Sequence, residues 1–548
     1  MVARPCYHNL QYFFMKIILI IFVNFFLFLS VFKFCSSVTA QTTNFSPLDE
    51  KKQLERSTGF RIKKIKVDGY TVFSQKEIER VVAPYLGKNL SYQQLRQVTK
   101  KITDLYVNNG YLTSGAFFPE QEITNEIATI RVVEGKLERV ETRGLKKLKG
   151  NYLRSRLQSN RETPLNVKRL EENIQLLQQD PLIEKIDAKL VEGSSLGESV
   201  LLLNVKEASP WTANIIANNY NSANSGELQG IATISHQNLL GFRDRLGLGY
   251  NLTNGFDSIN VDYTLPLNYR GSSLNVEYSD GDSEIIQSDF NDFGIRADAN
   301  VVSLRFDQSL VRRLNRDVAL FVAIDKRSSN TFIKDETPFS FTEGPQDGRS
   351  RVTALRLGSS WTERSKTLVT SGTMRFNLGL DLFDATINEN DPDGIFFSWL
   401  GQLQFVKALN QKQDTLLVTR LAAQLTPDSL LPLEQIAIGG ANTVRGYREN
   451  RGVGDNGVFG TVELQLPLVR DSKVGDLNLV PFFDAGTVWS NDDDETSTLA
   501  SLGLGVDWEI KQWFTVDLDW GIPLIDASDF DDSLQDKGFH FQLRIQPF

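Results

Sequence analysis

One arginine in a glycine-rich stretch is the residue of this sequence best suited to bind a charged group. Arg445 lies within residues 439–448, whose glycines let the backbone turn tightly and lie close against other groups. Its guanidinium is a permanent cation with a planar fork of donors, and that fork fits a carboxylate. Asp484 and Glu463 lie inward on the two strand-like segments that follow, so either is a candidate partner. The arrangement predicts an ion pair that holds a loop in place.

Catalytic and metal-binding patterns do not accompany this arginine. The sequence has no G-x-S-x-G, no H-E-x-x-H and no phosphate-binding glycine loop. After the first forty residues it has no cysteine, and its only histidines are His236 and His540, which disfavours structural zinc. We therefore expect no catalytic residue, no metal and no cofactor. A formal net charge of −9 also gives nucleic acid no electrostatic attraction to the chain.

The arginine stretch lies in a connection of about thirty residues between two strand-like segments, 415–425 and 458–468. Connections longer than about 15 residues without secondary structure are uncommon and are usually functional. A solvated surface loop with an incidental arginine is the alternative interpretation.

Apolar and polar residues alternate from Trp211 to the end of the chain, as expected for half-buried strands. Short connections alternate with long polar ones, as in a transmembrane β-barrel of about 16 antiparallel strands. We predict this barrel over residues 209–548. The predicted strands begin near residues 211, 228, 245, 258, 272, 302, 317, 351, 372, 396, 414, 458, 477, 499, 512 and 539.

Two short motifs resemble the signatures of the BamA-like superfamily of outer-membrane barrels. V-R-G-Y at 444–447 resembles its loop tetrad, and F-F-D-A-G at 482–486 resembles its F-x-D-x-G motif on the inner barrel wall. The resemblance implies that loop 426–457 folds back into the lumen and that Arg445 pairs with Asp484, or with Glu463 as the weaker candidate. The residues that carry it are Val444, Arg445, Gly446, Tyr447, Phe482, Asp484 and Gly486.

The first forty residues are predicted to be a signal peptide. Lys16 precedes the apolar run 17–32, and small residues precede a cleavage site after Ala40. A membrane anchor helix is the alternative, although a run of about 16 residues is short for a bilayer. Cys6 and Cys35 both lie in this segment, so the mature chain would contain no disulfide.

Residues 60–135 and 136–208 each predict a β-α-α-β-β unit, and a repeat of that length indicates tandem modules. The predicted helices are 74–86, with Ser74 and Glu77 as a capping box, 91–108, 149–157 and 167–179. The first predicted strand covers 62–67, and another covers 111–118. V-F-S at 72–74, N-G-Y at 109–111 and V-V-E-G at 132–135 resemble a first POTRA domain, and P-L-N at 164–166 resembles a second.

The combination resembles two-partner secretion transporters of the TpsB type. It implies α+β POTRA modules in the periplasm, followed by an all-β barrel in the outer membrane. The family usually has a lumen-plugging helix, for which residues 41–59 are the candidate segment, but the usual Pro-rich linker is missing. The resemblance also implies contact with outer-membrane lipid and, through the terminal aromatic Phe548, with the barrel assembly machinery during biogenesis.

The implied function is ATP-independent secretion of a large, unfolded, β-helical exoprotein that the POTRA modules capture. A barrel-assembly factor of the BamA type is the alternative, and a passive porin is a third. Two POTRA units favour secretion, because assembly factors usually carry more.

Overall fold

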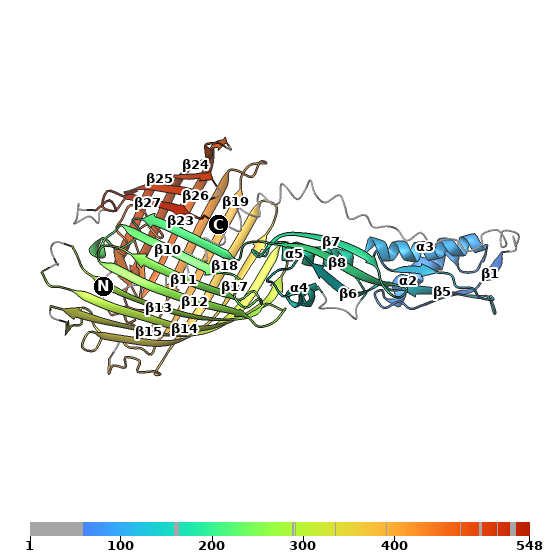
Figure 1. Ribbon diagram of the computed structural model, residues 1–548, viewed down its shortest axis with the longest axis horizontal. Coiled ribbons are helices and arrows are strands. Elements are labelled where there is room, and N and C mark those ends of the chain that lie inside the picture. The colour runs from blue at the N-terminus through green and yellow to red at the C-terminus, as the bar shows by residue number, and fades with distance from the viewer. Residues whose placement is uncertain are drawn as a thin grey trace. The chain divides into compact units, whose positions relative to one another are not determined.

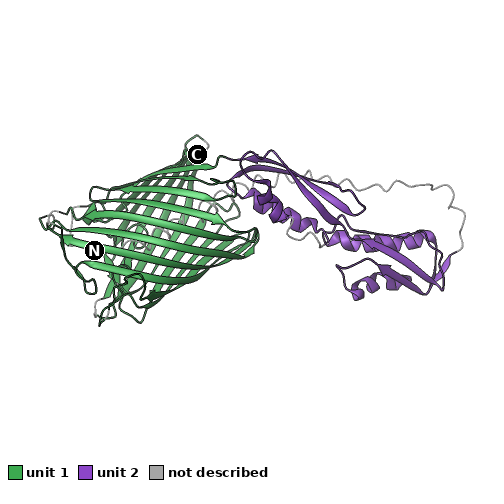
Figure 2. Cartoon of the chain, turned by 60° about the horizontal axis from the view of Figure 1, so that its bottom comes forward, with its two compact units in different colours: residues 1–19, 209–548 green, residues 20–208 purple. Residues whose placement is uncertain are grey.

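The computed structural model describes residues 59–157, 164–287, 290, 292–334, 336–390, 392–471, 473–492, 496–511, 513–525 and 533–547. The predictions for the signal peptide 1–40, for the plug segment up to residue 58 and for Phe548 lie outside these residues. The chain forms two compact units that meet between Ala208 and Ser209, and Figure 2 colours them separately.

The C-terminal unit is a closed antiparallel barrel, drawn in Figure 1 from green to red. In its described part sixteen long strands form the ring, and the last pairs with the first, with Gln542 opposite Asn218. The strands are β9 (Trp211–Asn218), β10 (Gln229–His236), β11 (Arg245–Leu252), β12 (Phe256–Pro266), β13 (Ser272–Glu284), β14 (Arg296–Arg312), β15 (Arg316–Ile333), β17 (Arg349–Arg364), β18 (Leu368–Leu380), β19 (Phe397–Ala408), β20 (Leu416–Leu425), β23 (Asn456–Asp471), β24 (Gly475–Trp489), β25 (Thr496–Lys511), β26 (Phe514–Pro523) and β27 (Phe539–Ile545).

The predicted strand count is therefore confirmed. The largest error in a strand start is at β14, which begins at Arg296 and not near residue 302. A two-residue strand, β16 (Thr337–Pro338), pairs with β15 inside the connection to β17. It is not one of the sixteen long strands of the ring, because β15 also pairs directly with β17. Period-2 alternation identified the strands correctly because each barrel strand has one face toward lipid and one toward the lumen.

The alternation is visible along single strands. On β11, Leu248, Tyr250 and Leu252 are 45%, 47% and 51% exposed, whereas Asn251 between them is buried. On β24, Phe483 is exposed while its neighbours Phe482 and Asp484 are buried. The exposed side chains are apolar and the enclosed ones include polar groups, which is the reverse of a water-soluble barrel.

The connection between β20 and β23 lies on the inner wall of the barrel. It contains a hairpin of β21 (Ile436–Ile438) and β22 (Gly452–Gly454). Its apolar residues pack against inward-facing barrel residues in one cluster: Ala422, Ile436, Ile438, Val444, Tyr447, Phe459, Val488 and Leu499. The interpretation of this connection as a solvated surface loop is therefore wrong, because its apolar side chains are buried.

The first module of the N-terminal unit contains β1 (Phe60–Ile62), β2 (Lys64–Asp68), α2 (Gln75–Val82), the 3₁₀ turn η1 (Ala83–Tyr85), β3 (Lys88–Leu90), α3 (Tyr92–Asn108), β4 (Gly115–Phe117) and β5 (Ile127–Val133). Its main sheet has the order β2-β5-β4, and its helices enclose an apolar core with that sheet. The capping box of Ser74 and Glu77 is present at the start of α2.

Three boundaries in this module differ from the predictions. The strand predicted over 62–67 is two strands, because β1 pairs with β3 whereas β2 pairs with β5. The helix predicted to reach residue 86 ends at Val82, and Pro84 lies in the 3₁₀ turn that follows. The strand predicted over 111–118 covers only Gly115–Phe117, because the chain first turns after α3, where Gly110 has a φ of +92°.

The second module contains β6 (Lys136–Arg143), α4 (Gly150–Leu157), α5 (Val167–Gln178), β7 (Ile183–Glu192) and β8 (Glu198–Glu207), with the sheet order β6-β8-β7. Both modules thus contain the predicted β-α-α-β-β unit, and the first adds the small β1–β3 sheet. None of the helices in the described residues is long and apolar enough to cross a membrane.

The two modules are joined end to end through their helices. The amide of Val167, at the start of α5, donates to the carbonyl of Gly110 after α3 at 2.8 Å. The side-chain amide of Asn166 donates to the carbonyl of Asn109 at 3.0 Å. The free carbonyls at the end of one helix thus satisfy the free amides at the start of the next, and the two helix dipoles lie head to tail.

Glu134 of V-V-E-G ties the first module together. Its carboxylate accepts hydrogen bonds from the amides of Thr71 and Val72 at 2.7 and 2.9 Å and from the hydroxyl of Tyr106 at 2.6 Å. Burial alone would raise the pKa of Glu134, but these hydrogen bonds hold it below its ordinary value. The turn before α2, helix α3 and the end of β5 therefore share one ionised carboxylate.

We expect Glu134→Gln to lower the free energy of unfolding of the 59–208 fragment by about 1–2 kcal/mol at pH 7, because hydrogen bonds to a charged acceptor are lost. A carboxyl with a lowered folded-state pKa stabilises the fold above its unfolded pKa of about 4.3, and this contribution disappears as pH falls through the folded value. Denaturant titrations should therefore show the variant and the parent converging below about pH 4. Exposed Glu122→Gln is the control, and a constant difference at every pH would contradict the assignment.

Candidate functional site

Arg445 reaches Asp484 with three donors. Its Nε and Nη2 atoms lie 2.8 and 2.9 Å from the two carboxylate oxygens of Asp484, and its backbone amide donates to Oδ2 at 3.1 Å. Such a forked, charge-assisted contact fixes the orientation of both groups as well as their distance. The structure thus brings the first predicted pair together.

Two further carboxylates surround the same guanidinium. Glu463 Oε1 lies 2.9 Å from Nη2 of Arg445, and Asp519 Oδ1 lies 3.3 Å from Nη1. Arg420 of β20 contacts Glu463 as well, at 2.8 Å. Two cations therefore meet three carboxylates that come from β23, β24 and β26. Asp519 and Arg420 are absent from the predicted site, although the alternation already places Asp519 on the inward face of its strand.

The spacing of F-x-D-x-G accounts for the other contacts on β24. Side chains two apart share one face of a strand, so Phe482 and Asp484 both point inward. The ring of Phe482 lies 3.4 Å below the guanidinium carbon of Arg445, a cation–π contact beside the ion pair. Gly486 is the next inward residue, where a Cβ would come within 2.7 Å of the Cβ of Phe459. Each motif position thus has its own contact.

The tetrad residues on either side of Arg445 fix the loop backbone against the barrel wall. Val444 is fully buried in the loop–wall cluster. The hydroxyl of Tyr447 lies 2.8 Å from the carbonyl oxygens of both Ala500, within β25, and Ile525, just after the end of β26. The next residue, Arg448, forms an ion pair with Asp536 in the connection to β27, and this pair is absent from the predicted site.

Gly446 lies directly on the backbone of β26. Its φ is +91°, and a Cβ there would lie 2.9 Å from the carbonyl group of Gly521. Conversely, a Cβ on Gly521 would lie 2.6 Å from the amide nitrogen of Gly446. That amide is 3.3 Å from Nε2 of His540, which accepts its hydrogen bond. A matched pair of glycines is therefore needed for the loop to approach the wall this closely.

The charged groups of the site are almost fully removed from solvent. The side chains of Arg445, Glu463 and Asp484 are 7%, 5% and 0% exposed. Exposed ion pairs contribute about 0–1 kcal/mol, whereas removing one partner of a buried pair costs about 3–5 kcal/mol. At this burial the second figure applies, because an unpaired charge would remain inside the wall. The site can hold the loop firmly, and it contains no nucleophile–base pair within the described residues.

Comparison with known proteins gives two family matches. Residues 197–508, more than half of the chain, match the family described as haemolysin secretion/activation protein ShlB/FhaC/HecB. Residues 60–135 match the POTRA domain of ShlB type.

Individual relatives agree with these matches. The outer membrane transporter CdiB of Escherichia coli O6:K15:H31 (strain 536 / UPEC) is 27% identical over 470 residues, which cover 83% of this chain and 78% of that protein. The hemolysin transporter protein HpmB of Proteus mirabilis is 23% identical over 420 residues, covering 73% and 70%. A solved structure of CdiB from Escherichia coli has the same fold, with a TM-score of 0.69 at 22% identity over 92% of this chain and 93% of that one.

We expect Gly521→Ala to detach residues 440–448, the tip of the loop, from β26. The added methyl group would meet backbone atoms and not a movable side chain. Hydrogen exchange of the barrel in detergent should show residues 440–448 exchanging about tenfold faster or more than in the parent. Gly230→Ala on β10 is the matched control, because a Cβ there has only one neighbour, at 4.0 Å. Equal protection of residues 440–448 in both variants would contradict the close approach.

Proposed function

The chain belongs to the haemolysin secretion/activation family ShlB/FhaC/HecB and is an outer-membrane barrel with periplasmic POTRA domains, and from this premise we propose that it captures an unfolded exoprotein in the periplasm and secretes it through the barrel. The observation that carries the proposal is a free strand edge on the second POTRA module. An exposed edge binds an extended peptide through backbone hydrogen bonds, whatever the peptide's sequence.

The edge of the first module is the poorer template. Of its two edge strands, β2 and β4, the second has only three residues, and the outward amide of Ala116 already donates to Thr103 Oγ1 at 2.9 Å. Beside it lies a groove of about 490 Å³ between α3 and β4, lined in part by Arg96 and Lys100. This groove suits side chains of a bound peptide, with a preference for acidic ones, better than it suits an added strand.

The edge of the second module is longer and more open. Strand β7 has ten residues and forms one edge of the sheet β6-β8-β7. Near its start, Gln178 of α5 accepts a hydrogen bond from the amide of Ile186 at 2.7 Å, so the N–H of Ile186 points away from β8. Backbone N–H groups alternate in direction along a strand, so those of Ala188 and Leu190 also point away from β8. In the described residues nothing occupies their outward amides, so this part of β7 supplies the free edge.

The driving force would come from the exoprotein. The sequence has no nucleotide-binding motif, so we propose that transport does not use ATP and that folding outside the cell makes it directional. A chain that remains extended in the periplasm and folds into a repetitive β-structure outside fits this scheme, because strand addition binds only extended segments.

The ion cluster of Arg445 would control the lumen. The loop lies on the inner wall, so a passing chain must either run beside it or displace it. Buried ion pairs hold one arrangement firmly, yet water can replace them once the loop leaves the wall. We therefore assign Arg445, Asp484 and Glu463 to conformational control of the conduit, with little effect on folding of the barrel.

We expect Ala188→Pro to abolish secretion of the exoprotein that this chain exports, because it removes an outward N–H without removing a ladder bond to β8. Immunoblots of the culture medium, normalised to transporter in the outer membrane, measure the effect. Ala188→Val keeps the amide and should secrete normally. Normal secretion by the proline variant would exclude strand addition at β7. Loss of newly inserted outer-membrane barrels in place of the exoprotein would favour the assembly-factor alternative.

We expect Arg445→Ala and Asp484→Ala each to impair secretion at unchanged levels of folded barrel. The arginine variant should be worse, because Asp484 and Asp519 both lose their cation, whereas in the aspartate variant Arg445 keeps Glu463 and Asp519. The reciprocal exchange, Arg445→Asp with Asp484→Arg, should recover part of the secretion rate. A double-mutant cycle on that rate with purely additive losses would exclude a direct role of the pair. Heat-modifiable migration on gels reports whether each barrel has folded.

A further inference from the structure

We propose that the lumenal loop has a second, independent lock at its base, formed by Glu434 with Arg356, Asp325 and Arg327, and that this base lock stays closed when the tip around Arg445 is released. The two locks lie on different parts of the inner wall. The charged wall residues of the base lock lie on β15 and β17. Those at the tip lie on β20, β23, β24 and β26, so β18 and β19 lie between the two sets around the ring.

Glu434 binds Arg356 with both carboxylate oxygens. Nη1 and Nη2 of Arg356 lie 3.1 and 2.8 Å from Oε2 and Oε1 of Glu434. Nε of Arg356 donates to Asp325 Oδ2, and Asp325 Oδ1 accepts a hydrogen bond from Ser303 at 2.6 Å. Nη1 of Arg327 is 3.4 Å from Glu434 and 3.3 Å from the carbonyl oxygen of Leu433. Two cations and two carboxylates thus form one network.

The base lock is more buried and better balanced in charge than the tip. The side chains of Arg356 and Glu434 are each 2% exposed, and those of Arg327 and Asp325 are 5% and 9% exposed. Among these four groups, removing Glu434 would leave two guanidinium groups with a single carboxylate. At the tip, Glu463 keeps its contact with Arg420 when Arg445 departs, but Asp484 and Asp519 lose the guanidinium group that they share. The charges of the base lock therefore sum to zero, whereas the tip has three carboxylates for two guanidinium groups.

Apolar and backbone contacts reinforce the base. The loop residues Leu430, Leu431 and Leu433 pack against the wall in one cluster with Val352, Ala354 and Phe396. The side chain of Asp455, at the other end of the loop, accepts a hydrogen bond from the amide of Leu430 at 2.9 Å. The two arms of the loop are thus tied to each other at the base.

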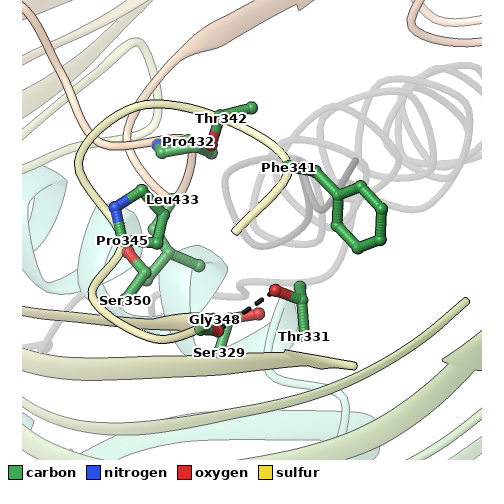
Figure 3. A pocket seen from close by; sticks show the side chains of 9 residues that line it. All are labelled: Ser329, Thr331, Phe341, Thr342, Pro345, Gly348, Ser350, Pro432 and Leu433. Carbon is green, nitrogen blue, oxygen red and sulfur yellow. Dashed lines mark hydrogen bonds between the residues drawn. The ribbon is translucent and has the colours of Figure 1, made fainter. Parts of the chain in front are cut away.

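A small pocket lies between the base and strands β15 and β17. Pro432 and Leu433 line it from the loop, and Figure 3 shows them facing residues of β15, β17 and the connection between these strands. Ser329 and Ser350 line it with hydroxyl groups that have no protein partner in the described residues and are each 4% exposed. The pocket holds about 30 Å³, enough for one water, so water can bridge these hydroxyls beside the lock.

The chain between the two locks contains the turning points that such a motion needs. Gly439 and Gly440 follow β21 directly and have φ angles of +101° and +97°. Glycine changes φ between positive and negative values without a steric penalty, so the tip can swing about this pair while the base stays in place. The β21–β22 hairpin is the arm between the base and the tip.

Hydrogen exchange of the full chain in lipid nanodiscs tests the two locks separately and does not depend on secretion. In Arg445→Ala we expect exchange of residues 440–448 to rise about tenfold or more, while residues 428–436 change by less than about twofold. In Glu434→Gln, a nearly isosteric change in the loop that leaves the strands intact, we expect residues 428–436 to exchange about tenfold faster or more.

Glu363→Gln is the control for charge loss on the same pair of strands. Glu363 of β17 pairs with Arg316 of β15 at 2.6 Å, but both side chains are more than half exposed, so neither loop segment should change. Equal acceleration of both segments in Arg445→Ala would overturn the proposal, because the loop would then open as one unit. Unchanged protection of residues 428–436 in Glu434→Gln would overturn the base lock.

Discussion

A guanidinium group removed from water needs carboxylates around it, and this requirement determines where the lumenal loop lies. Arg445 meets Asp484, Glu463 and Asp519, which come from three different strands. These carboxylates converge only because the strand register brings them to one height on the inner wall. A shift of one residue in any of the three strands would turn its carboxylate toward lipid. Barrel register and loop position are therefore specified together.

Close backbone approach is the second part of the same constraint. The guanidinium reaches its carboxylates because Gly446 and Gly521 allow the loop to lie on β26 without intervening side chains. Phe482 then closes the site from below and shields the charges. The two glycines let the backbones meet, and the phenylalanine ring covers the ion pair. Both exclude water from the charged groups.

Under the proposed function the lumenal loop must hold one position and also move, and charge is suited to both. Apolar packing of the loop loses stabilisation whenever the loop leaves the wall, and water offers nothing in return. Ionised groups lose their partners but regain hydration, so the difference between the closed and open states is smaller. The two modules of the periplasmic unit meet through hydrogen bonds between helix ends, which favours a fixed arrangement of their two sheets.

Local pattern determined much of this protein, and spatial convergence decided the rest. The sixteen strands follow from period-2 alternation, the helices from their caps and spacing, and Arg445, Asp484 and Glu463 from two short motifs with inward parity. Alternation assigns a residue to one face of its strand but not to a level along the barrel axis. It therefore could not predict that Asp519 and Arg420 lie at the site. Nor could it separate β1 from β2, because a change of strand partner leaves the pattern of apolar residues unaltered. Glu434 and Arg356 lie 78 residues apart, and only closure of the ring and burial of the loop bring their charges together.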